Sequence, residues 1–239
     1  MRTTRTMWQP RIPLVAVPLI ALCALPNATE VRAASFDCSK ANSRVEQLIC
    51  QDEEVSALDD HLARYYRAAR VVLGRGGECL KTEQRQWIAN VRGRCTERDC
   101  LRRVYLARLA ELDGLQPGAT AIQGIDLPQG ARMLGILPAA EDQLAAPRTS
   151  ESAPVEISGR IVDEVETGDG FVLRDGRGKS YLLRPLMFIE PEDANLLASA
   201  IRDQESTYIV RGFLETGEQS ASFAVSQCAY IYRLPPAQR

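Results

Sequence analysis

The sequence predicts an α+β multidomain protein, in which a small disulfide-bonded antiparallel helical bundle precedes a five-stranded β-barrel. Three observations lead to this prediction. An export-type segment precedes an even set of cysteines, residues 36–115 carry apolar residues at helical spacing, and short alternating segments begin after Pro154. We therefore divide the chain into a signal peptide (1–33), a helical domain (34–115), a linker (116–154) and a β domain (155–239).

The first residues have the pattern of a secretory signal peptide. Three arginines precede an apolar run over residues 12–25, and the small residues Ala33 and Ala34 follow. The run is too short, and too interrupted by proline, to span a membrane. We place cleavage after Ala33 or Ala34 and expect a periplasmic or secreted protein with no stable membrane span. A lipoprotein is less favoured, because bulky Leu22 precedes Cys23.

Six cysteines remain after cleavage, and their number predicts three disulfides in an oxidising compartment. No C-x-x-C occurs and His61 is the only histidine, so we expect neither a metal site nor a cofactor. The six are Cys38, Cys50, Cys79, Cys95, Cys100 and Cys228.

Residues 36–115 are expected to form four helices. Ser43 and Glu46 make a capping box, and an apolar seam then runs from Val55 to Val72. Glycines follow, a third helix covers residues 80–91, and the last starts at a Thr96 cap. We expect Trp87 to face the core, together with its neighbour Ile88. Short connections make the helices antiparallel neighbours.

This geometry leaves more than one disulfide pairing open. With Thr96 as the cap, Cys95 and Cys100 take the two positions that touch in a hydrophobic staple. The other pair of the bundle lies at the same end, so a crossed pairing is possible, and four cysteines permit three connectivities. We favour Cys38–Cys50 with Cys95–Cys100. Cys79 then pairs with Cys228 and joins the two domains.

The second half of the chain changes character. Residues 116–154 are rich in Pro, Gly, Ala, Gln and Ser, with one weak apolar patch at 133–137, and are interpreted as a linker. Five strands are expected at 155–165, 171–174, 181–184, 208–214 and 223–232, with a helix at 191–201 between the third and fourth. This order is typical of an OB-like barrel, a fold that binds oligosaccharides. Phe171, Tyr181 and Tyr208 are candidate stacking residues, although strand aromatics are more often core.

Charge and residue types exclude several functions. Removing residues 1–33 leaves 30 acidic and 25 basic residues, and this acidic balance argues against a nucleic-acid partner. His61 has no free thiolate beside it, so no nucleophile–base pair is available. We predict a protein that is not an enzyme.

A series of short motifs resembles the LprI-like lysozyme inhibitor family. They occur in order across residues 36–112, and they are specific only as a set. The resemblance implies an exported helical domain that inhibits lysozyme, and it does not extend to Cys79 or to the β domain. The motifs include Phe36-Asp-Cys38, Ile49-Cys50, Glu83-Gln-Arg-Gln-Trp87, Arg92-x-x-Cys95, Cys100-Leu101 and Arg108-Leu109.

Two surfaces are candidates for the lysozyme contact. The first contains Arg92, Arg94 and Arg98 around the Cys95–Cys100 loop, where a cation on a rigid loop could enter a cleft lined by two carboxylates. The second contains Asp59 and Asp60, whose charge could steer the protein toward a basic lysozyme. A solvated charged face is the ordinary reading of either set.

Two functions follow. The expected partner is lysozyme or another peptidoglycan-cleaving enzyme, which the protein would bind to protect the cell wall. The alternative is a non-enzymatic cell-envelope adaptor whose OB-like domain binds a glycan or a protein.

Overall fold

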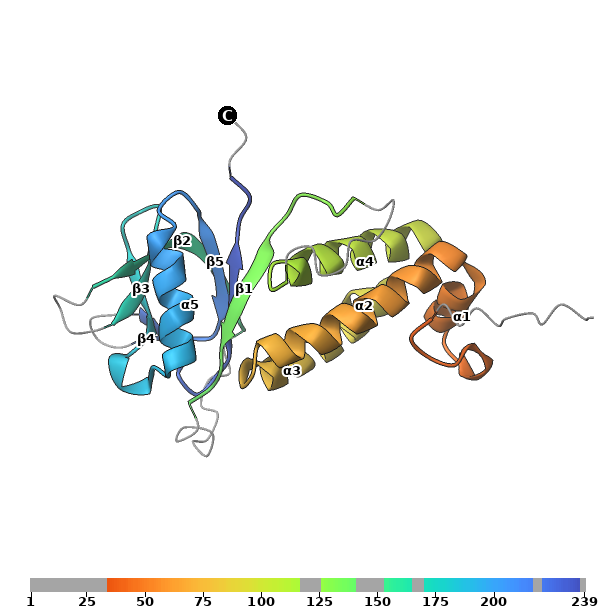
Figure 1. Ribbon diagram of the computed structural model, residues 1–239, viewed down its shortest axis with the longest axis horizontal. Coiled ribbons are helices and arrows are strands. Elements are labelled where there is room, and N and C mark those ends of the chain that lie inside the picture. Colours follow the sequence, from red (N-terminus) through yellow and green to blue (C-terminus); the bar gives the residue numbers. More distant parts are fainter. Residues whose placement is uncertain (1–33, 117–125, 141–152, 165–169, 217–220, 237–239) are drawn as a thin grey trace, which may run out of the picture. The chain divides into compact units, whose positions relative to one another are not determined.

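The structure contains a group of helices followed by a mixed β-sheet, which confirms the α+β class (Figure 1). This computed structural model describes residues 34–116, 126–140, 153–164, 170–216 and 221–236. The predicted signal peptide at 1–33 and the lipoprotein alternative at Cys23 lie outside these residues. Helices and sheet belong to one compact unit, residues 32–239. Among the described helices, none is both long and apolar enough to cross a membrane.

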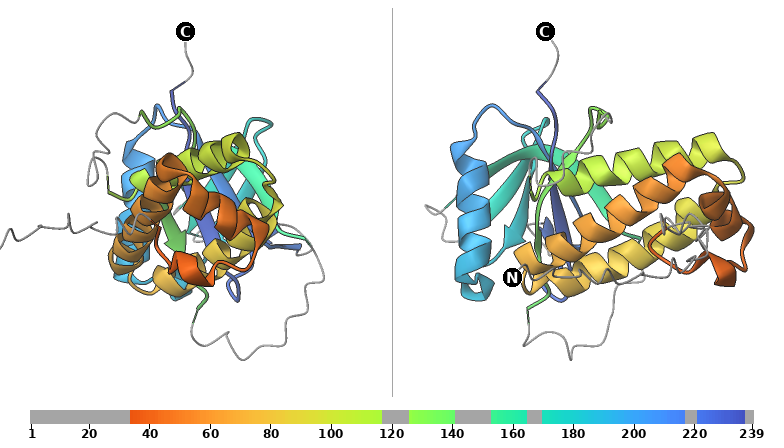
Figure 2. Two further views of the ribbon diagram at one scale, coloured as in Figure 1. Left: turned by 90° about the vertical axis from the view of Figure 1, so that its right-hand side faces the viewer. Right: turned by 45° about the vertical axis from the view of Figure 1, so that its right-hand side comes forward.

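The helical part is built around one long central helix. This helix, α2, packs against α1, α3 and α4, and Figure 2 shows the long helices side by side. The elements are η1 (Cys38–Lys40), α1 (Arg44–Gln51), α2 (Glu53–Val72), α3 (Gly76–Asn90), η2 (Arg92–Arg94) and α4 (Arg98–Asp113).

Local sequence explains where these helices begin. The predicted capping box is confirmed: the amide of Glu46 donates to Ser43 Oγ at 3.1 Å, and the amide of Ser43 donates to Glu46 Oε2 at 3.0 Å. Asp52 caps α2 by accepting from the amide of Val55 at 3.0 Å.

Two helix starts differ from the prediction. The prediction that Thr96 caps the last helix is wrong. Helix α4 begins at Arg98, because the backbone of Glu97 is still extended inside the loop closed by Cys95 and Cys100. The third helix starts earlier than expected, at Gly76. A side chain at that position would bring its Cβ within 3.3 Å of the Ile136 Cβ, so glycine allows close packing of strand β1 (Arg132–Leu137) there.

The core of the bundle confirms the apolar seam from Val55 as far as Ala69, whereas Val72 at its predicted end is 58% exposed. Leu58, Leu62 and Tyr65 of α2 are buried together with residues of α4. Trp87 is half-buried and packs edge-on against Tyr105, with 5.6 Å between ring centroids. The expectation that Ile88 faces the core is wrong, because 36% of that residue is exposed.

The second half forms one eight-stranded sheet in the order β1-β8-β5-β2-β3-β4-β7-β6. Its pairs are antiparallel except for β4 with β7. The strands are β1 (Arg132–Leu137), β2 (Val155–Asp163), β3 (Phe171–Asp175), β4 (Ser180–Arg184), β5 (Tyr208–Gly212), β6 (Leu214–Thr216), β7 (Ala221–Phe223) and β8 (Ala229–Arg233), with η5 (Leu186–Phe188) and α5 (Pro191–Arg202) between β4 and β5.

The predicted five-stranded OB-like barrel is not supported. The weak apolar patch in the predicted linker is a strand, β1, which pairs with β8. The last two predicted strands are each interrupted, the first at Phe213 and the second by a turn in which the amide of Gln227 donates to Ala224 O at 3.2 Å. The division of the chain into two separate domains stays a prediction.

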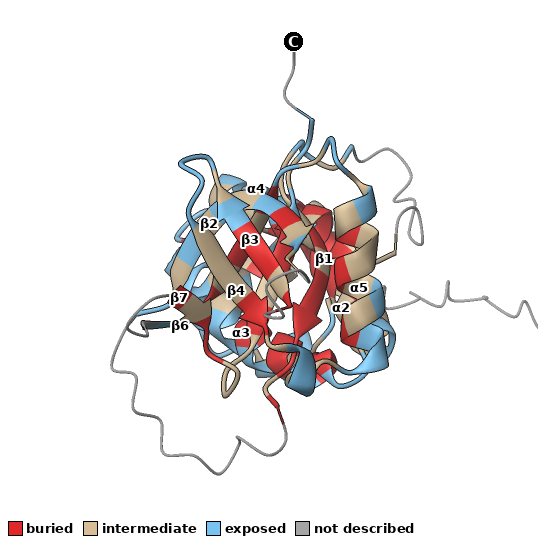
Figure 3. Ribbon diagram, turned by 90° about the vertical axis from the view of Figure 1, so that its left-hand side faces the viewer, coloured by how far each residue is buried: buried red, intermediate tan, exposed pale blue. Residues whose placement is uncertain are grey.

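The sheet contributes to two hydrophobic cores, because side chains alternate between its faces. On β5 and β8, Tyr208, Val210 and Ile231 enter a core that includes Leu197 of α5. Ile209, Tyr230 and Tyr232 instead pack against the core of the helical bundle. Figure 3 shows buried residues along β1 and β3 in red.

Candidate functional site

Three disulfides are present among the described residues, and their pairing is the one favoured from the sequence. Cys38–Cys50 ties η1 to α1, Cys95–Cys100 closes the connection between α3 and α4, and Cys79–Cys228 ties α3 to the sheet. Their Cα–Cα distances are 5.8, 5.5 and 6.1 Å, respectively.

The connection between α3 and α4, here called the connecting loop (residues 91–97), is folded tightly onto the end of α3. The amide of Val91 donates to Trp87 O at 2.9 Å, and the amide of Cys95 donates to Arg92 O at 3.1 Å. A Cβ at Gly93 would lie 3.0 Å from Ile88 O, so glycine permits this close approach. Backbone hydrogen bonds and the disulfide together fix the loop.

Arg92 anchors the connecting loop to α2 through its side chain. Its side chain is only 16% exposed, and Nη1 lies 3.6 Å from Asp59 Oδ1, whose side chain is 5% exposed. Asp59 also accepts from Tyr105 Oη at 2.6 Å, and from the Ser35 amide and Oγ at 2.9 and 2.5 Å. Burial, followed by the charge of Asp59, raises the pKa of Tyr105 well above its ordinary value. Two predicted contact residues, Arg92 and Asp59, are thus joined inside the protein.

We expect Asp59→Asn to lower the free energy of unfolding by about 1–3 kcal/mol, because Arg92 would lose its buried partner and Ser35 would face an amide. Asp60→Asn is the matched control. Asp60 pairs with Arg64 at the surface, and such a pair contributes about 0–1 kcal/mol. Urea unfolding of both variants measures the difference, and equal losses would mean that Asp59 has no special structural role.

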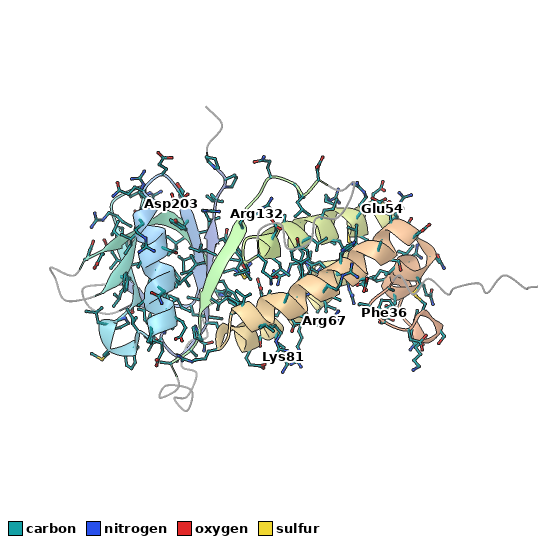
Figure 4. The ribbon with its side chains drawn as sticks, viewed as in Figure 1. Phe36, Glu54, Arg67, Lys81, Arg132 and Asp203 are labelled. Atoms are coloured by element: carbon teal, nitrogen blue, oxygen red, sulfur yellow. A yellow bond between two sulfur atoms is a disulfide. The ribbon has the colours of Figure 1, made fainter. Side chains whose placement is uncertain are left out.

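The predicted basic surface meets acidic side chains at the N-terminal ends of α4 and α2. Arg98 Nε lies 3.0 Å from Asp52 Oδ2, and Arg98 Nη2 lies 3.2 Å from Glu54 Oε2. Arg102 Nε donates to Glu54 Oε1 at 2.6 Å, and this bond is the main reason why the pKa of Glu54 is lowered. Figure 4 labels Glu54 at this end of α2. Arg98 therefore already makes two ion pairs within the protein.

Arg94 differs from the other predicted contact residues. It is exposed, and its guanidinium makes no ion pair with any side chain that the structure describes. Two exposed apolar residues accompany it, Ile88 at 36% and Val91 at 42% exposure. Besides Thr96 and Glu97, the structure thus leaves the side chains of Val91 and Arg94 of the connecting loop exposed, together with Ile88 at the end of α3.

A buried ionic cluster, absent from the sequence-based predictions, lies between the helices and the sheet. The Arg108 side chain is 1% exposed, and Nη2 donates to Glu83 Oε2 at 2.8 Å. Its Nε donates to Gln84 Oε1 at 3.1 Å, and its Nη1 donates to Glu111 Oε2 at 2.7 Å. Glu83, Gln84 and Arg108 all belong to the motifs shared with the LprI-like family. Their presence in those motifs was the sequence signal that could have identified the cluster.

The sheet completes this cluster. Tyr232 Oη donates to Glu83 Oε1 at 2.8 Å, and Arg211 of β5 also pairs with Glu83. The Arg211 guanidinium lies 5.4 and 5.1 Å from the ring centroids of Tyr230 and Tyr232. Burial acts to raise the pKa of Glu83, but Arg108, Arg211 and Tyr232 outweigh it and lower that pKa. Nothing in the sequence linked Glu83 to strands this far along the chain.

The described residues do not meet the requirements of a metal site. Within the described ranges, no three His, Cys, Asp or Glu side chains are grouped so that they could hold a metal ion.

Comparison with known proteins agrees with the motif series. Residues 37–112 match the family model of the lysozyme inhibitor LprI. Proteins named Lipoprotein LprI from Mycobacterium tuberculosis and Mycobacterium bovis are 32% identical over 116 residues, which cover 45% of this chain and 57% of theirs. The chain thus spans little more than half the length of these curated relatives, and no solved structure matches it. The helical segment 37–112 is therefore similar to the LprI family of lysozyme inhibitors.

Proposed function

We propose that this protein is a non-enzymatic inhibitor that binds lysozyme, or another peptidoglycan-cleaving enzyme, and so protects the cell wall. The observation that carries the proposal is the match of residues 37–112 to the LprI family. Three disulfides among the described residues suit an oxidising compartment, and we place the protein in the periplasm or outside the cell after signal cleavage.

The arrangement of the helices supports this function. The sheet is tied to the first turn of α3 by Cys79–Cys228, whereas the connecting loop follows the last turn of α3. At 1.5 Å per residue, the chain rises about 18 Å between Cys79 and the start of the connecting loop at Val91. The connecting loop is thus available to a partner while the sheet stays attached.

The test is a titration of lysozymes of several classes with the full mature chain. We expect dose-dependent loss of peptidoglycan hydrolysis that saturates at one inhibitor per enzyme. Protein that has been reduced and alkylated serves as the control and should lose inhibition, because the helices depend on their disulfides. If no lysozyme is inhibited or bound, the proposal is wrong.

A cell-envelope adaptor is the second candidate, favoured by an exposed apolar turn. Leu186 and Met187 of η5 are 48% and 82% exposed, so a partner that covered this turn would remove apolar area from water. Glycan stacking has less support, because Tyr208 is buried and its hydroxyl donates to Ala200 O at 3.3 Å. The same titration separates the two functions, since an adaptor leaves lysozyme activity unchanged.

A further inference from the structure

The outer side of the connecting loop combines apolar area with an available charge. Ile88 and Val91 stand three residues apart at the end of α3, a spacing that makes side chains neighbours. Both are exposed, and Arg94 follows on the next turn of chain with its guanidinium in solvent. We call these three residues the Ile88 surface.

Of the three arginines predicted to contact lysozyme, only Arg94 makes no ion pair with a side chain that the structure describes. Arg92 is held by Asp59 beneath the loop, and Arg98 is paired with Asp52 and Glu54. A guanidinium presents a planar set of donors that matches a carboxylate, so Arg94 suits an acidic partner site.

The Ile88 surface is also fixed before binding. The Cys95–Cys100 disulfide closes the loop, the Arg92–Asp59 pair anchors it, and Gly93 lies against the carbonyl of Ile88. A surface that is already ordered loses little conformational entropy in a complex, which favours affinity.

We propose that the Ile88 surface is the part that enters the substrate cleft of the target lysozyme. Glycoside hydrolases of this type carry two carboxyl groups on either side of the bond that they cleave. Arg94 would pair with one of these carboxylates, while Ile88 and Val91 cover the apolar wall of the cleft. This inference rests on the proposed function and identifies the residues through which it acts.

The test compares inhibition constants of full-length variants whose thermal midpoints match that of the parent. Arg94→Ala should weaken inhibition by roughly tenfold or more, because it leaves a carboxylate desolvated and unpaired. Arg94→Lys should restore part of the loss, since it keeps the charge without the planar donors. Most of the change should appear in the dissociation rate. Ile88→Ser should weaken inhibition several-fold, because less apolar area is covered.

Matched controls lie on α2 near its junction with α3. Arg67 is an exposed cation, labelled in Figure 4, and Val71 is an apolar residue that is 81% exposed. Arg67→Ala and Val71→Ser should change inhibition by less than about twofold, because they lie far from the connecting loop. If these variants lose inhibition and the Ile88 surface variants do not, the contact lies elsewhere and the inference is overturned.

A competition experiment tests the place of binding on the enzyme. An N-acetylglucosamine oligomer that fills the cleft should raise the apparent dissociation constant of the parent complex in inverse proportion to the fraction of enzyme that it leaves unoccupied. Unchanged affinity in the presence of a saturating oligomer rules out the cleft, although inhibition itself would still stand. Failure of the parent to bind or inhibit any lysozyme would instead remove the proposed function, and this inference with it.

Discussion

Arg108→Met is expected to lower the free energy of unfolding by about 3–5 kcal/mol, since it removes one partner of a buried ion pair. Glu83 would stay buried with only part of its compensation, and Glu111 and Gln84 would each lose a donor. Equilibrium urea unfolding measures the loss. The exposed pair between Arg102 and Glu54 provides the control, because Arg102→Ala removes only a surface ion pair and should leave the free energy of unfolding almost unchanged.

Acidification gives an independent check on the same cluster. The folded pKa of Glu83 lies below its ordinary value of 4.5, so its contribution is fully present above that pH. The contribution is lost as the pH falls through the lowered pKa. The difference in stability between the parent and Arg108→Met should therefore shrink in acid. A loss below about 1 kcal/mol at neutral pH would contradict the role assigned to Arg108.

Replacing Cys79 and Cys228 with alanine should cost about 4–5 kcal/mol of stability, because this bond joins residues 149 positions apart and restricts the unfolded chain strongly. Removing Cys95–Cys100, with a separation of 5, should cost about 2 kcal/mol on the same entropic account. Urea unfolding of the two double variants measures both effects. The order of the two losses is the critical result. A larger loss of stability on removing Cys95–Cys100 than on removing Cys79–Cys228 would contradict this entropic account.

The loss of lysozyme inhibition should be larger for the Cys95–Cys100 variant than for the Cys79–Cys228 variant. The Cys95–Cys100 variant frees the connecting loop and should inhibit less well, whereas the Cys79–Cys228 variant keeps the Ile88 surface in place. Comparing the two in the lysozyme titration thus separates stability from binding.

Elements set by local chemistry could be predicted from the sequence. The capping box at Ser43 and the proline at the start of α5 determine nearby backbone, and both helices are observed. Strand β1 could not be predicted, because its six residues form a sheet only by pairing with β8, far along the chain. The interruptions near Phe213 and after Ala224 depend in the same way on tertiary contacts.

The candidate site shows the same limit at the level of side chains. The sequence placed Arg92 and Arg94 together on one loop, but one points toward Asp59 and the other toward solvent. Two neighbouring acids divide similarly, with Asp59 inside and Asp60 at the surface. Which way a charged side chain turns depends on partners from other helices, and no local pattern identifies them.

The shared carboxylate of Glu83 affects how the protein can be divided. Its neighbours come from α4, β5 and β8, so a polypeptide that stopped after α4 would expose a carboxylate, a guanidinium and apolar area that the strands now cover. The family match ends at residue 112. We therefore expect the smallest fragment that keeps the native state to extend well past that point, and homology is a poor guide to where this chain can be cut.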